Sequence, residues 1–153
     1  MTSKAAAGSA AGSAKPTPGK PDEILLVYDK ECPACDTYCR FVEVQPSAGR
    51  LTLVDARDRT PVMDEITRAG LDIDQGMVVK MDGKIYYGSD AINALALVSS
   101  RSGFFNRLSH HAFRSRTMAR LLYPPLRVCR NLLLKILGKT KINNLRVKGN
   151  DRF

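Results

Sequence analysis

The apolar and polar positions of the first half of the chain predict alternating strands and helices. Residues 24–28 form an apolar run without polar alternation, which is typical of a strand buried on both faces of a sheet. Apolar residues at helical spacing then predict a helix over residues 33–44, which Pro46 and Gly49 end. Residues 51–55 predict a second strand, and residues 61–70 a second helix.

The pattern changes to a hairpin after residue 76. Two β-favouring runs, 77–81 and 84–87, flank Asp82-Gly83, a pair that tolerates the positive φ values of a tight turn. An apolar helix follows over residues 91–98, and Ser89 or Asp90 is placed to cap it. The resulting order, β-α-β-α-β-β-α, predicts an α/β protein with a thioredoxin-like fold.

Three further segments surround this domain, which we expect to span residues 23–100. Residues 1–22 are rich in Ala, Gly, Ser and Pro, and predict a disordered leader. Residues 101–138 predict a basic helical extension, with helices over 112–122 and 125–137 because Pro124-Pro125 should interrupt them and Gly138 should end the second. Residues 139–153 predict a flexible basic tail.

The positive charge is concentrated in the last third of the chain. The net charge is +9, yet residues 1–100 carry 11 Lys and Arg against 14 Asp and Glu, whereas residues 101–153 carry 13 against one. We expect residues 101–153 to pack on their own domain, with an anionic membrane surface or an acidic partner as the main alternative. Nucleic acid is not an expected partner, because no nucleic-acid-binding motif accompanies the charge.

The sequence has no apolar segment that predicts export or membrane insertion. Residues 1–22 do not resemble a signal peptide, and the longest apolar runs are far shorter than the roughly 18 to 20 residues that cross a bilayer. We therefore expect a soluble, cytoplasmic protein.

The candidate chemistry lies in a cluster of three of the four cysteines, Cys32, Cys35 and Cys39. Cys32 and Cys35 form a CxxC pair where the first strand leads into the first helix, a position typical of redox-active dithiols. The positive end of the helix dipole favours a thiolate at Cys32, which makes it the expected nucleophile. Cys35, expected one turn deeper and less exposed, would resolve the mixed disulfide.

Other residues around the pair admit more than one interpretation. Asp29 ends the first strand and could relay a proton, although its charge would by itself raise the pKa of a neighbouring thiol. Cys39 is most simply a buried core residue. A zinc site formed by the three cysteines with His110 or His111 is the structural alternative, but the second closely spaced ligand pair typical of such sites is lacking.

These residues resemble a known family, the DCC-type thiol-disulfide oxidoreductases, whose signature is Asp-x-x-Cys-x-x-Cys after an opening strand. Here it reads Asp29-Lys30-Glu31-Cys32-Pro33-Ala34-Cys35, and the similarity extends over roughly residues 24–137. Lys30 departs from the pattern, since many members carry Gly there. The resemblance implies a thioredoxin-like fold with Asp29, Cys32 and Cys35 as the signature positions.

The sequence thus predicts an enzyme that exchanges disulfides with a disulfide-containing protein or a small thiol substrate, using Cys32, Cys35 and Asp29 and no bound cofactor. Thioredoxins guide an extended substrate backbone with a cis-proline before the hairpin, but Gln75 and Gly76 stand at that point here. The alternative is a non-catalytic interaction or zinc-binding module of the same fold, in which the basic C-terminal segment carries the function.

Overall fold

The computed structural model describes residues 23–153. The leader predicted over residues 1–22 lies outside the described residues. The elements follow the order β1 (Glu23–Tyr28), α1 (Pro33–Phe41), β2 (Arg50–Asp55), α2 (Pro61–Arg68), β3 (Val78–Met81), β4 (Lys84–Tyr87), α3 (Ser89–Val98), α4 (Phe104–Phe113) and α5 (Arg116–Ile136). The helix α1 is three residues shorter than predicted, because residues 43–45 bond instead to the segment after α3.

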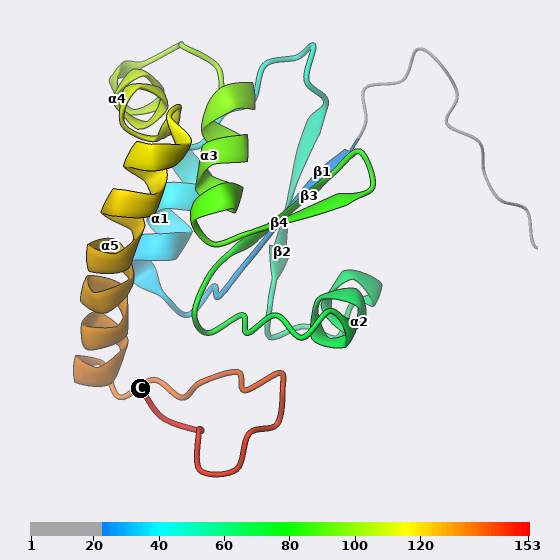
Figure 1. Ribbon diagram of the computed structural model, residues 1–153, viewed down its shortest axis with the longest axis vertical. Coiled ribbons are helices and arrows are strands. Elements are labelled where there is room, and N and C mark those ends of the chain that lie inside the picture. Colours follow the sequence, from blue (N-terminus) through cyan, green and yellow to red (C-terminus); the bar gives the residue numbers. More distant parts are fainter. Residues whose placement is uncertain (1–22) are drawn as a thin grey trace, which may run out of the picture.

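The four strands of the described region form one mixed sheet in the order β2-β1-β3-β4. Strand β1 pairs in parallel with β2 and antiparallel with β3, and β3 and β4 form the hairpin. Helices α1, α3, α4 and α5 lie on one side of the sheet and α2 lies on the other (Figure 1). The predicted thioredoxin-like α/β fold, with a C-terminal helix added to it, is confirmed.

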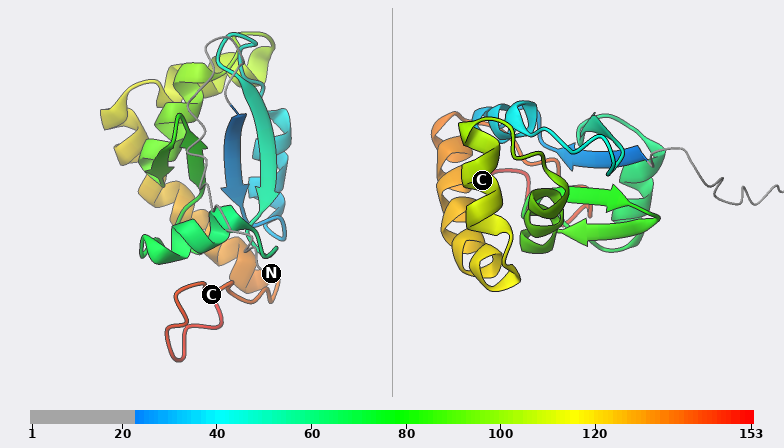
Figure 2. Two further views of the ribbon diagram at one scale, coloured as in Figure 1. Left: turned by 90° about the vertical axis from the view of Figure 1, so that its right-hand side faces the viewer. Right: turned by 90° about the horizontal axis from the view of Figure 1, so that it is seen from above.

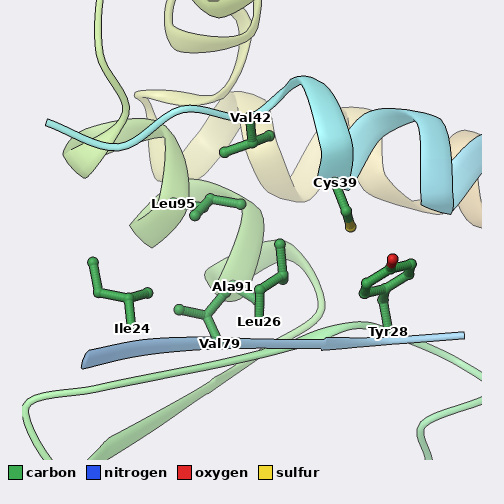
Figure 3. Packing of buried hydrophobic residues seen from close by; sticks show 8 residues of the cluster. All are labelled: Ile24, Leu26, Tyr28, Cys39, Val42, Val79, Ala91 and Leu95. Atoms are coloured by element: carbon green, nitrogen blue, oxygen red, sulfur yellow. The ribbon is translucent and has the colours of Figure 1, made fainter. Parts of the chain in front are cut away.

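Strand β1 is buried on both faces, as its apolar run predicted. Ile24, Leu26 and Tyr28 point toward α1 and α3, where they pack with Cys39 and Leu95 (Figure 3). Val27 points to the opposite face and packs in a second cluster with residues of α2. Because successive side chains of a strand alternate between faces, β1 joins the two halves of the core.

The hairpin turn is as predicted, but the start of α3 is not. Asp82 and Gly83 both adopt positive φ, at 52° and 72°, as the tight turn requires. The predicted cap by Ser89 or Asp90 is wrong, because both residues lie inside α3 and the cap position is Gly88, which makes no side-chain hydrogen bond. Gly88 has a φ of 59°, a conformation that favours glycine and turns the chain directly from β4 into the helix.

The helical extension is organised differently from our prediction. The first helix, α4, begins eight residues earlier than expected, and α5 continues through Pro124 and Pro125 to Ile136. Each proline lacks the N–H group of one helical hydrogen bond. The carbonyl groups left without this donor belong to the exposed residues Arg120 and Leu121, so water can donate to them instead. Packing of α5 against α3 and α4 keeps both halves in one helix (Figure 2). Gly138 ends α5 as predicted, with a φ of 65°.

The C-terminal segment, residues 139–153, which the sequence predicts to be a flexible tail, makes hydrogen bonds to the domain. Figure 1 shows it folded back beneath the sheet. The buried carboxylate of Asp74 accepts hydrogen bonds from the backbone N–H groups of Ile142 and Asn143, at 2.8 and 2.6 Å. These contacts could not be predicted from the composition of the segment, because they are made by backbone N–H groups, which nearly every residue carries.

None of the helices in residues 23–153 is both long and apolar enough to cross a membrane.

The Asp74 contacts generate a prediction about stability. Asp74→Ala leaves two partly buried N–H groups without an acceptor, so we expect the free energy of unfolding in urea to fall by about 1 to 3 kcal/mol. Amide hydrogen exchange at Ile142 and Asn143 should also accelerate. Asp58→Ala, which removes a carboxylate from an exposed loop, is the matched control. Unchanged exchange in the Asp74 variant would contradict this assignment.

Candidate active site

The CxxC pair occupies the turn between β1 and the first residues of α1. Pro33 is the first helical residue, and Cys32 is the cap, with φ −84° and ψ 108°. The Cys32 Sγ atom accepts a hydrogen bond from the Cys35 backbone N–H at 3.3 Å. A sulfur in this position satisfies one of the free N–H groups of the helix start and lies at the positive end of its dipole.

The surroundings of Cys32 favour its thiolate. Hydrogen bonding from the Cys35 thiol contributes most to lowering the pKa of Cys32 to about 6, well below the ordinary value for a thiol. Burial acts in the opposite direction, while the Cys35 N–H group and the Arg130 guanidinium lower the pKa further. At neutral pH Cys32 is therefore mostly ionised.

Cys35 has the complementary state. Its hydrogen bond to Cys32, its burial and the charge on the Cys32 sulfur raise the pKa of Cys35 far above the ordinary value, so it stays protonated while Cys32 is ionised. The expected order of exposure is wrong, because Cys32 is 0% exposed and Cys35 is only partly buried. The Arg130 guanidinium, which α5 brings beside both sulfurs, is a neighbour that the local sequence did not reveal.

Asp29 is buried and paired with an arginine. Its carboxylate receives two hydrogen bonds from Arg57, at 2.9 and 3.2 Å, and one from the backbone N–H of Glu31 at 3.0 Å. Its carbonyl oxygen accepts the Cys32 N–H at 3.1 Å. Asp29 therefore fixes the loop that carries Cys32, and Arg57 compensates the negative charge that would otherwise disfavour the Cys32 thiolate.

Arg130 and Arg57 are site residues that sequence reasoning missed. Arg130 donates a hydrogen bond to the Asp74 carbonyl group and lies 3.8 Å from an Asp29 carboxylate oxygen. Burial disfavours its charged form, but Cys35, Cys32 and Asp29 reverse this effect and raise the pKa of Arg130 overall. For Arg130, the sequence showed only the excess of basic residues over 101–153, and this excess does not distinguish Arg130 from its neighbours.

The remaining candidate residues lie apart from the pair or within the core. Cys39 is buried in the cluster between α1 and the sheet, and Cys129 is exposed on α5. His110 bonds through its Nδ1 atom to the Ala96 carbonyl oxygen at 2.7 Å, and His111 is exposed. Within residues 23–153, no group of three or more His, Cys, Asp or Glu side chains could hold a metal ion, so the zinc alternative gains no support.

A cleft of about 530 Å³ opens beside Cys35. It lies between α1, α4, α5 and the segment before β3, and Arg130 and Asp29 contribute to its wall. Cys32 does not line it. The dithiol is thus reached through Cys35 and Arg130, next to a space large enough for a small molecule.

Comparison with known proteins gives one match. No significant match was found among curated proteins or among solved structures. A family model described as DCC1-like thiol-disulfide oxidoreductase matches residues 26–136, which include the CxxC pair, the whole sheet except its first residues, and α5. The match therefore spans every element that contributes to the site, and the chain belongs to the DCC1-like thiol-disulfide oxidoreductase family.

Proposed function

We propose that this protein catalyses thiol-disulfide exchange with Cys32 as nucleophile and Cys35 as resolving cysteine. The observation that carries the proposal is the place of the Cys32 sulfur at the start of α1, where it accepts the Cys35 backbone N–H at 3.3 Å. The pKa of Cys32, lowered to about 6, and the raised pKa of Cys35 agree with it. A thiolate is the attacking species in disulfide exchange, and a neighbouring thiol completes the reaction. The membership of the chain in an oxidoreductase family supports the same assignment.

In the forward reaction, the Cys32 thiolate attacks one sulfur of a substrate disulfide. The substrate S–S bond breaks, a mixed disulfide forms at Cys32, and one substrate thiolate leaves. Cys35 then loses its proton, which the departing thiolate or water can accept, and attacks the Cys32 sulfur. The second substrate thiolate leaves, so the substrate gains two electrons and the protein holds a Cys32–Cys35 disulfide.

Arg130 and Asp29 are positioning residues in this proposal. Arg130 stabilises the Cys32 thiolate by charge and hydrogen bonding. It also lines the cleft together with Cys35, whereas Cys32 is covered. Asp29 holds the cysteine loop through its backbone contacts and keeps its charge paired with Arg57.

The first test is a redox titration of the purified protein in graded dithiothreitol buffers, quenched by alkylation and mapped by mass spectrometry. We expect reversible two-electron conversion confined to Cys32 and Cys35, at a potential roughly between −270 and −120 mV. Cys32→Ser should abolish the exchange, while Cys129→Ser, which changes an exposed thiol, should leave the potential unchanged. Failure of Cys32 and Cys35 to pair would contradict the proposal.

The second test is the pH dependence of Cys32 alkylation. The rate should rise to half its maximum near pH 6, because the reactive thiolate forms as pH increases through its pKa. Arg130→Met removes a positive charge that favours the thiolate, so the midpoint should move to higher pH, by about one unit or more. Arg130→Lys keeps the charge and should restore most of the difference. Equal midpoints in all three proteins would remove Arg130 from this role.

A second candidate function concerns the outer face of α5. Four exposed apolar residues, Leu121, Val128, Leu132 and Ile136, recur at helical spacing among arginines. We infer that this face binds an anionic membrane surface, since apolar side chains on a basic helix suit that environment.

Liposome co-sedimentation tests this second candidate. Binding should require anionic lipid and weaken at high salt. Leu132→Glu should reduce it at least several-fold, whereas Leu97→Glu, on the exposed side of α3, should not. Equal binding to zwitterionic vesicles, or none to anionic ones, would exclude this function.

A further inference from the structure

The cleft beside Cys35 has an apolar interior. Its wall consists mainly of apolar and aromatic side chains from four elements, among them Tyr38, Ile92, Phe105, Leu108, Phe113 and Leu126. Tyr38 and Phe105 meet edge to face, with ring centroids 5.7 Å apart. An apolar wall beside a reactive dithiol provides binding energy for the organic part of a substrate, independently of its sulfur chemistry.

The segment before β3 is covered by Tyr123 of α5. Gly76 lies so close to it that a Cβ atom at this position would come 2.6 Å from the Tyr123 hydroxyl oxygen. That hydroxyl donates a hydrogen bond to the Gln75 carbonyl at 3.3 Å, and the Met77 carbonyl accepts one from Gly88 at 3.0 Å. Tyr123 therefore fills the space beside Gly76, and the Gln75 and Met77 carbonyl groups already have donors, which disfavours an extended polypeptide at this edge.

The charged residues of the cleft indicate the second property of its occupant. Arg127 and Arg130 are the two cations in its wall, and Asp29 is the one acid, with its carboxylate already bound by Arg57. The helix α5, which supplies both arginines, contains no Asp or Glu. An anionic group on the substrate would meet Arg127, which is exposed and makes no salt bridge among the described residues.

We propose that the substrate of this dithiol is a small disulfide whose apolar chain carries a carboxylate, bound in this cleft. The inference rests on the proposed function and names its substrate class. The chain lies against the aromatic wall, the carboxylate faces Arg127, and the disulfide faces Cys35, the cysteine of the pair that lines the cleft. The reaction is the two-electron exchange described above. The substrate S–S bond is reduced to two thiols, and Cys32 and Cys35 are oxidised to a disulfide.

The test compares the rates at which four disulfides oxidise the reduced protein, followed by quenching and mass spectrometry. They are dithiodihexanoate, its shorter analogue dithiodipropionate, the uncharged diamide of dithiodihexanoate, and glutathione disulfide. Dithiothreitol, reacting with the same four, corrects for intrinsic reactivity. After this correction, dithiodihexanoate should react at least about tenfold faster than dithiodipropionate, because each additional buried CH₂ group favours binding.

Matched variants connect this preference to the cleft. Leu108→Asp, at a lining position that is 57% exposed, should remove the chain-length preference. Leu97→Asp, at a position of α3 that is 55% exposed and outside the cleft, should retain it. Arg127→Gln should lower the rate of oxidation by dithiodihexanoate several-fold and leave the rate with its diamide unchanged. Arg107 is an exposed residue of α4 outside the cleft, so Arg107→Gln should change neither rate.

The outcomes separate this inference from the proposed function. If all four disulfides oxidise Cys32 and Cys35 at equal corrected rates, or if the two leucine variants behave alike, the substrate class is wrong and the exchange activity stands. A faster reaction with a disulfide-linked peptide than with dithiodihexanoate would also overturn it, in favour of a polypeptide substrate. If no reagent produces the Cys32–Cys35 disulfide, the proposed function itself fails.

Discussion

The buried ion pair of Asp29 and Arg57 is the interaction on which the rest of the site depends. The Asp29 side chain is fully buried, and its carboxylate is bound on both oxygens by one guanidinium group. Removing one member of a buried pair of this kind typically costs about 3 to 5 kcal/mol, because the other charge is left without compensation. Arg57 also donates to the Thr140 carbonyl at 2.7 Å. One guanidinium therefore connects the end of β1, the loop after β2 and the C-terminal segment.

This arrangement makes the C-terminal third of the chain part of the candidate site. Arg130 of α5 reaches both sulfurs, and Tyr123 of the same helix covers the segment before β3. Asp74 in turn binds the chain that follows α5. The core of four strands and three helices thus carries Cys32 and Cys35, while Arg130 of α5 adds to their charge environment and α4 and α5 shape the space beside them.

The elements of the core could be predicted from the sequence because their signals are local. The apolar run of β1, Pro33 after Cys32, and Asp82-Gly83 each restrict the backbone at their own position. The path of α5 could not be predicted in this way, because local rules disfavour a helix through Pro124 and Pro125, and packing against α3 and α4 outweighs them. Arg57 and Arg130 were missed for a related reason: each acts on a residue at least 28 positions away.

The Cys35 thiol and N–H group and the Arg130 guanidinium favour the ionised form of the covered Cys32 sulfur. Around them, Arg57 pairs with Asp29 and Glu31, at 2.9 and 3.5 Å, and Arg130 lies 3.8 Å from Asp29. In the proposed exchange, forming the Cys32–Cys35 disulfide would remove the negative charge of the Cys32 thiolate from beside Arg130. An anion near Arg130 would then be bound more tightly by the oxidised protein than by the reduced one. By thermodynamic linkage, a bound anion would stabilise the disulfide and make the dithiol a stronger reductant.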